Sequence, residues 1–248
     1  MPASYTHQCF GDDVLPRLST MIQRIISSYK DYYDLGLQGP DLFFYYHPTR
    51  KTLIRDFGLS LHKENAYSFF EEKIAYLHTN QDEEMMSYLF GFINHYLLDS
   101  YLHPLIMKHD HFACERDLDY KFIKEHKPKN RSVADHFSSR MTLCKKIGLL
   151  LHMEPILIQK SIRSFQFYGA ILYNHHKPIL RSAKLLLKLM HLPNANMVMI
   201  DSQEVDHTIS EHYDECVKDA SLQLETVYYA IIHGESLSST FNKNYYGK

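Results

Sequence analysis

Residues 91–104 read GFINHYLLDSYLHP, a largely apolar segment that carries His95, Asp99 and His103 at intervals of four residues. Each step of four residues advances only about 40° around an α-helix, so all three side chains project from one side. The same step rises about 6 Å, which suits a row of neighbouring ions better than one ion shared by all three. The segment therefore predicts a helix that lines a metal site, with Asp99 able to bridge two ions.

A second pair with the same spacing follows closely. His111 and Glu115 are again four residues apart, so both can reach one ion from a single helical turn. We expect Pro104 to disturb the first helix and let the chain bend back, bringing this pair toward it. A single histidine on such a helix would be unremarkable. The whole set favours metal, because burying unpartnered polar groups costs free energy that a bound cation compensates.

The rest of the chain reads as one all-α domain spanning residues 1–248. Glycine and proline number only 9 each, which is sparse for a protein of many strands and turns. Apolar residues recur at helical spacing. They predict helices near 15–33, 53–76, 83–101, 133–151, 155–173, 178–190 and 202–233. Residues 121–131 and 191–196 read as loops. We expect the ligand set within 1–120, helical completion over 121–235, and a frayed tail at 236–248.

Composition limits the function classes. A formal charge of −2 gives no global attraction to polyanions, so we expect no stable nucleic-acid partner. The four cysteines form no CxxC pair, which favours free thiols in a reducing compartment. The first residues lack the pattern of a secretory signal and no apolar run is long enough for a transmembrane segment, so we expect a cytoplasmic protein. Histidine, with 17 copies, is the residue type in unusual excess.

Several short motifs, taken together, resemble a known family. They are Tyr5-Thr6-His7, Gly39-Pro40-Asp41, Leu61-His62, the 95–99 segment with His103, and His111 to Glu115. In this order they are similar to the zinc-dependent phospholipases C, together with the phospholipase D domain that cleaves glycosylphosphatidylinositol anchors. The resemblance covers roughly the N-terminal half of the chain.

The resemblance implies an all-helical fold with zinc ions in a cleft and a phosphodiester substrate, with a phospholipid head group the first candidate. Its ligand sets would be Asp41, His62, His95 and Asp99 for one ion, and His103, His111 and Glu115 for a second. Asp99 would bridge to a third ion held by His7 and the N-terminal residue. A metal-bound hydroxide would attack phosphorus, with Asp41 as general base.

The number of ions is expected to be two or three. Secreted bacterial members begin with a tryptophan whose amino group binds the third zinc, whereas this chain contains no tryptophan. Removal of Met1 would expose the amine of Pro2 as a substitute.

Three other functions fit the same residues. A helical phosphohydrolase of the His-Asp type would use His62, His109 with Asp110, and a later aspartate, making Asp110 essential and His95 dispensable. A single-strand nuclease of the related branch is a second alternative. The third is a non-catalytic protein in which zinc only cross-links helices.

Overall fold

The computed structural model describes residues 4–48, 50–129, 132–174, 176–189, 198, 205 and 207–248. Within these residues the regular structure is helical and no strand occurs, which confirms the predicted all-α class. The α-helices are α1 (Ser4–Val14), α2 (Thr20–Ser28), α3 (Lys30–Gly36), α4 (Leu53–Lys63), α5 (Ala66–Asn80), α6 (Glu83–Ile106), α7 (His111–His126), α8 (Met141–Leu151), α9 (Pro155–Leu172), α10 (Lys177–Leu189) and α11 (His207–His233). The 3-10 helices are η1 (Leu15–Arg17), η2 (Gly39–Tyr45), η3 (Val133–His136) and η5 (Ser239–Phe241).

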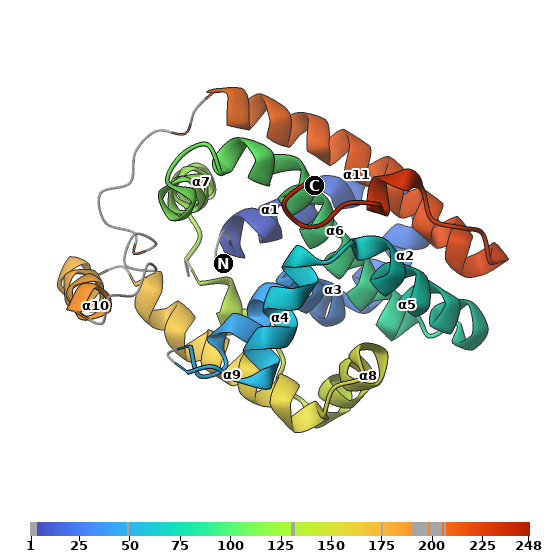
Figure 1. Ribbon diagram of the computed structural model, residues 1–248, viewed down its shortest axis with the longest axis horizontal. Helices are drawn as coiled ribbons and strands as arrows, with labels where there is room; N and C mark the ends of the chain where they lie inside the picture. Colours follow the sequence, from blue (N-terminus) through green and yellow to red (C-terminus); the bar gives the residue numbers. More distant parts are fainter. Residues whose placement is uncertain are drawn as a thin grey trace.

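Helix α6 forms the centre of the molecule, and other helices surround it (Figure 1). Every residue from 85 to 99 is buried. A helix that is apolar on all sides needs packing partners all round. Helices α3 and α11 lie along α6, and α1, α2 and α8 also contact it. The polar side chains of Ser87, Asn94, His95, Asp99 and His103 are therefore held inside the protein core.

Two glycines allow α3 to lie directly against α6. A Cβ atom on Gly91 would collide with the backbone carbonyl of Tyr33, and one on Gly36 would collide with that of Tyr88. Backbone atoms cannot rotate away as a side chain can, so only glycine fits at this crossing. Gly36 is also the last residue of α3, so this glycine lies at the end of its helix as well as at the crossing.

We expect Gly91→Ala to destabilise the fold by about 1–3 kcal/mol, the usual cost of overpacking a tight core. Gly11→Ala in α1 is the matched control, because its new methyl group would meet only the movable side chain of Leu37. Both variants gain similar helix propensity, which makes the backbone collision the difference between them. Urea unfolding of the parent and the two variants measures the difference in their free energies of unfolding. Equal stability of the two variants would contradict the close-approach argument.

Several predicted helices are divided or shifted in the structure. The 15–33 segment is broken into η1, α2 and α3, and the 53–76 segment into α4 and α5. Asn65 begins α5 by accepting a hydrogen bond from the Tyr67 amide, and helices start readily at such caps. Helix α1 was not predicted. The 121–131 loop is shorter than expected, because α7 continues to His126. The predicted 191–196 loop lies outside the described residues.

The expected bend at Pro104 is wrong. Helix α6 continues through Pro104 to Ile106, and the chain reverses only before Asp110, whose side chain caps α7. A proline in the last turn loses a single hydrogen bond, the one to the carbonyl four residues earlier, which a helix end tolerates.

The expected fraying of residues 236–248 is also wrong. Phe241 and Tyr245 are almost fully buried, and the tail packs against the core. The prediction followed the polar composition of the tail and gave too little weight to its two aromatic residues. Their burial offsets the entropic cost of ordering the chain.

No helix in the described part of the chain is both long enough and apolar enough to cross a bilayer.

Candidate metal centre

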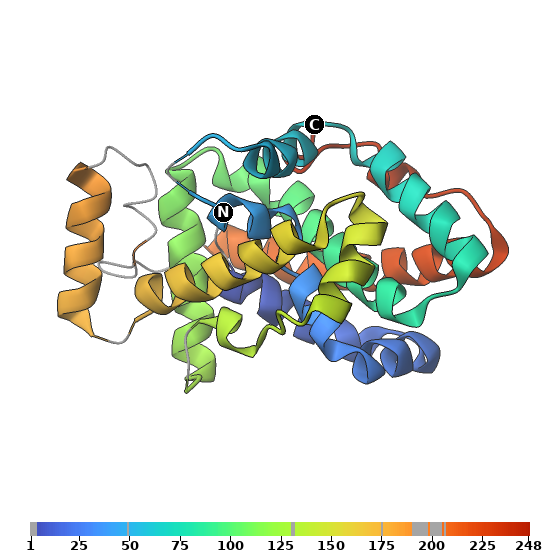
Figure 2. The ribbon, with the colours of Figure 1, turned by 90° about the horizontal axis from the view of Figure 1, so that it is seen from below.

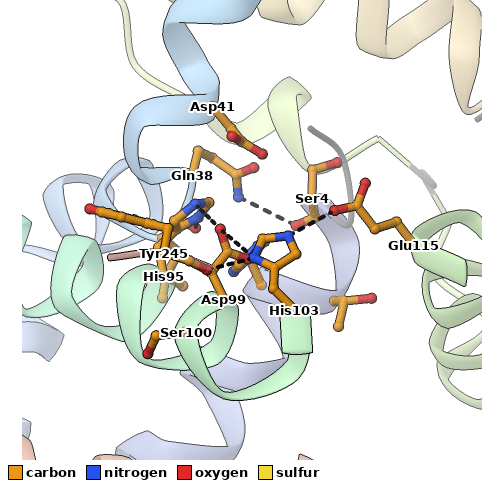
Figure 3. Close-up of polar contacts among 12 residues, drawn as sticks. Ser4, Gln38, Asp41, His95, Asp99, Ser100, His103, Glu115 and Tyr245 are labelled. Atoms are coloured by element: carbon orange, nitrogen blue, oxygen red, sulfur yellow. Dashed lines mark hydrogen bonds and ion pairs between the residues drawn. The ribbon is translucent and has the colours of Figure 1, made fainter. Parts of the chain in front are cut away.

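All eight side chains that the sequence singles out converge on one region of the core. His7 comes from α1, Asp41 from η2, His62 from α4, His95, Asp99 and His103 from α6, and His111 and Glu115 from α7. They form three groups, in each of which the potential ligand atoms lie within 4.8 Å of one another: His7, His95 and Asp99; Asp41, His62 and His95; and His103, His111 and Glu115. Figure 3 shows Asp99 between His95 and His103, with Glu115 directed toward His103.

Asp99 is the centre of the arrangement. Its Oδ1 lies 3.4 Å from Nε2 of His7, and its Oδ2 lies 3.3 Å from Nε2 of His95. Oδ2 is also 3.7 Å from Nε2 of His62 and 3.8 Å from Nδ1 of His103. Burial opposes ionisation of this carboxyl group, but the positive charges of His103 and His95 hold the pKa of Asp99 well below its ordinary range. One buried carboxylate therefore faces imidazoles from three different helices.

The second group joins η2 to α4. Nε2 of His62 lies 3.2 Å from Oδ1 of Asp41, and both side chains are buried. Two glycines make this approach possible. Gly39 has a φ of +48°, and a Cβ there would lie 2.5 Å from the His95 ring. At Gly58, a Cβ would lie 2.9 Å from the carbonyl oxygen of Pro40. The backbone can therefore pass close to the histidines and bring Asp41 to them.

The third group joins the end of α6 to the start of α7. Nε2 of His111 lies 2.8 Å from Oε1 of Glu115 and 3.1 Å from Nε2 of His103. Burial lowers the pKa of His103, but Asp99 and Glu115 outweigh this effect and raise it to about 9. Nε2 of His103 and Nε2 of His111 are too close to face each other as two lone pairs, so a proton or a metal ion must lie between them.

Backbone carbonyls fix the orientation of three imidazoles. Nδ1 of His62 donates to Gly58 O at 2.8 Å, and Nδ1 of His95 donates to Leu37 O at 3.0 Å. Nδ1 of His103 donates to Tyr245 O at 2.7 Å. A histidine whose Nδ1–H is held in this way presents the lone pair of Nε2 to the site, and such outer partners are typical of metal-binding histidines.

The donor set fits zinc. Imidazole nitrogens and carboxylate oxygens are its usual ligands besides thiolate. Nε2 of His95 is buried and has no hydrogen-bond partner among the described residues, although it faces Asp99. An unsatisfied buried nitrogen costs free energy, and a bound cation would remove that cost. The residues present therefore suit the ion that the sequence predicts.

Asp119, which was not predicted from the sequence as a site residue, holds the start of α1 in place. Oδ1 of Asp119 accepts hydrogen bonds of 2.7 Å from both the amide and the hydroxyl of Thr6. Oδ2 accepts a hydrogen bond from the hydroxyl of Tyr173, which in turn accepts one from Ser4. These bonds satisfy first-turn amides of the helix that carries His7. Asp119 extends the four-residue series of His111 and Glu115 by one step, and that spacing was the available signal.

Asp119 should make stability fall as pH rises. Burial raises the pKa of Asp119 from its ordinary 3.8 to about 7, although hydrogen bonds from Tyr173 and Thr6 oppose the shift. Between these two values the folded state keeps a proton that the unfolded state has released. The free energy of unfolding then decreases with rising pH, by at most about 1.4 kcal/mol per pH unit.

We expect Asp119→Asn, which cannot titrate, to remove this contribution. Urea unfolding of metal-free parent and variant at about pH 5 and about pH 8 measures the difference, in which the shared titration of the histidines cancels. If the parent and the variant lose stability equally over this interval, Asp119 is ionised throughout.

The remaining predictions have mixed outcomes. The N-terminal residue, expected at a third ion, lies outside the described residues. His109 and Asp110, the pair required by a His-Asp phosphohydrolase, are both exposed. The Asp110 side chain accepts a hydrogen bond from the Ala113 amide as the cap of α7. It is His111, not His109, that joins His103 and Glu115.

Comparisons with known proteins give one match. The family model described as zinc dependent phospholipase C matches residues 6–153, which is more than half of the chain and includes all eight converging side chains. Neither the curated proteins nor the solved structures provide a match. The family match points to zinc, and so do the three groups of histidine and carboxylate side chains. The chain belongs to the zinc-dependent phospholipase C family.

Proposed function

We propose that the protein is a zinc-dependent hydrolase of phosphodiesters, acting on a phospholipid head group. The observation that carries this proposal is the convergence of three groups of ligand-type side chains around Asp99. Family membership supports the lipid substrate. The orientation of His62, His95 and His103 by backbone carbonyls supports a site prepared for metal rather than a set of surface histidines.

The three groups would hold the ions. Asp41, His62 and His95 would hold one, and His103, His111 and Glu115 a second; His7 with Asp99 would contribute to a third. When bound, zinc supplies a Lewis acid that offsets negative charge on the phosphoryl oxygens. Asp99 would lie next to all three groups, because its carboxylate is within 4 Å of His7, His62, His95 and His103.

The protein side chains would position the substrate and handle its protons. The Asp41 carboxylate would accept a proton from the attacking water, as a general base. The Asp41 and His111 side chains are 10% and 24% exposed, whereas that of His95 is fully buried. We therefore infer that substrate approaches from the side of Asp41 and His111, while His95 remains shielded from solvent.

The test combines metal analysis with a substrate panel. Purified protein is assayed for zinc per chain and for hydrolysis of phosphatidylcholine, phosphatidylinositol, a soluble phosphocholine diester and single-stranded oligonucleotides. Asp41→Asn should lower kcat by about a hundredfold or more, in the range of a lost general base. Asp56→Asn is the control, because Asp56 lies exposed on the neighbouring α4 and should leave activity unchanged.

Two outcomes would contradict the proposed function, and a third would contradict the role of Asp41. Zinc-loaded protein that hydrolyses none of these diesters would favour structural zinc. Hydrolysis of oligonucleotides alone would assign a nuclease. Full activity in Asp41→Asn would place the base elsewhere.

A further inference from the structure

The last residues of the chain connect two helices that carry predicted zinc ligands. The hydroxyl of Tyr96, on α6, donates to the carbonyls of Thr240 and Lys243. The amide of Ala66, at the start of α5, also donates to Lys243 O. The side chain of Asn244 donates to Lys63 O at the end of α4. The C-terminus consequently lies beside α6 (Figure 1).

The last five residues, 244–248, form a hydrogen-bonded turn that packs against α6. The amide of Asn244 donates to Lys248 O, and its side-chain oxygen accepts from the amides of Tyr246 and Lys248. Gly247 adopts a φ of +72°, and a Cβ there would lie 2.5 Å from Ser100 O. The turn therefore requires glycine at this position for both its backbone conformation and its packing.

This turn brings Tyr245 and Tyr246 to the metal centre. Tyr245 O accepts the Nδ1–H of His103 at 2.7 Å. The Tyr245 ring lies 4.9 Å from the ring of His62, and the Tyr246 ring lies 5.4 Å from that of His103. Of the three carbonyls that orient site histidines, Tyr245 O is the one supplied by a segment beyond residue 153, where the family match ends.

We propose that residues 236–248 form a strap that completes the metal centre, with Tyr245 as a positioning residue for His103. The inference rests on the proposed zinc site. Holding Nδ1–H on Tyr245 O leaves Nε2 of His103 as the nitrogen that faces His111 and Glu115. Loss of such an outer partner typically weakens metal binding by about 10–100-fold.

Two glycines provide a matched test. Gly247→Ala introduces a Cβ at positive φ that meets the backbone of α6, and should displace the strap. Gly234→Ala introduces the same strain at a φ of +73°, but its Cβ meets only the imidazole of His78, away from the centre. Both substitutions place an alanine in the left-handed region, so the backbone strain is the same in the two variants. The readouts are zinc per chain, zinc affinity by competition with a chelator, and unfolding of the zinc-free proteins.

We expect zinc affinity to fall by about 10-fold or more in Gly247→Ala, and to stay at the parent value in Gly234→Ala. Unchanged zinc affinity in Gly247→Ala would overturn the strap while leaving the proposed function intact. Weakened affinity in both variants would also overturn it, because general destabilisation would then be the cause. A parent protein that binds zinc without hydrolysing diesters would contradict the function alone, and one that binds no zinc would overturn both.

A separate observation concerns α10, which stands at the edge of the molecule (Figure 2). It packs on α9 and buries Leu180. Three of its leucines are largely in solvent, with Leu185 60%, Leu186 58% and Leu189 68% exposed. Large side chains exposed together on one helix indicate an interaction surface.

The charge of α10 indicates the partner. Lys177, Arg181, Lys184 and Lys188 recur at intervals of three or four residues, so they share one face beside the leucines. Residues 177–189 contain no acidic side chain, although the whole chain has a net charge of −2. We infer that α10 docks on an anionic lipid surface, with its leucines among the acyl chains and its basic groups at the head-group phosphates.

Vesicle sedimentation tests this docking surface. The parent should bind vesicles of phosphatidylcholine with phosphatidylserine, and bind pure phosphatidylcholine weakly. The double variant Leu185→Ser, Leu189→Ser should lose about tenfold or more in vesicle affinity, because two leucines no longer enter the apolar layer. Leu222→Ser on α11 is the control, since Leu222 is 65% exposed.

Absence of parental binding, or equal binding by the double variant, would overturn the docking surface. Self-association of the parent that the double variant abolishes would assign the leucines to a second copy of the chain instead. Neither result depends on zinc.

Discussion

Asp99→Asn should produce the largest loss of function of any single substitution in this protein. Asp99 lies within 4 Å of His7, His62, His95 and His103, so its charge acts on every part of the centre. Asparagine keeps the shape but removes the negative charge and one acceptor. We expect zinc affinity and kcat each to fall by more than about a hundredfold, since losing even an outer partner costs about 10–100-fold.

Zinc analysis, chelator competition and hydrolysis of a soluble diester measure these losses. Asp56→Asn, an exposed substitution of the same type on α4, serves as the control. The circular dichroism of both variants should remain helical, because the core around α6 is otherwise unchanged. Parental zinc content and activity in Asp99→Asn would refute the central role of this carboxylate.

Removal of zinc should cause the second large effect, a loss of thermal stability. A ligand that binds only the folded state, at a free concentration of about 1,000 times Kd, adds about 4 kcal/mol per site. For a chain of this length, that corresponds to a melting temperature about 8–16 °C higher for each such site. The predicted ligand side chains come from α1, η2, α4, α6 and α7, so the ions would join elements far apart in the sequence.

Differential scanning calorimetry of chelator-treated protein, before and after addition of zinc, measures this shift. Calcium is the control cation, because it prefers sites made entirely of oxygen ligands and should restore little stability. A melting temperature that does not respond to zinc would mean that the three groups bind no ion in the folded protein.

The spacing of residues along the chain was sufficient to predict the helices that carry the centre. His95, Asp99 and His103 share a face because of helical geometry, and His111 and Glu115 follow the same rule. These residues are neighbours along the chain, so their spacing alone predicts that they lie on one face of a helix. The other three residues, His7, Asp41 and His62, are far from this segment in sequence. The resemblance to a family, rather than their spacing, predicted them.

The sequence did not predict the elements that depend on distant partners. Helix α1 begins where Asp119 accepts hydrogen bonds from Thr6, and these two residues are 113 positions apart. The tail appeared polar enough to fray, yet Tyr245 is buried and its carbonyl holds His103 across 142 positions. The composition of a short segment does not indicate contacts with residues so far away in the sequence.

The sequence by itself determined an all-α chain and the helix faces that bear the potential ligands, because both follow from periodicities of three and four residues. Only the tertiary structure decided which ligands form groups, that glycines at positions 39 and 58 allow Asp41 to approach His62, and that the C-terminal tail reaches the centre. The physical reason is that burial and hydrogen bonding between distant segments overrode the local preference of the polar tail to remain disordered.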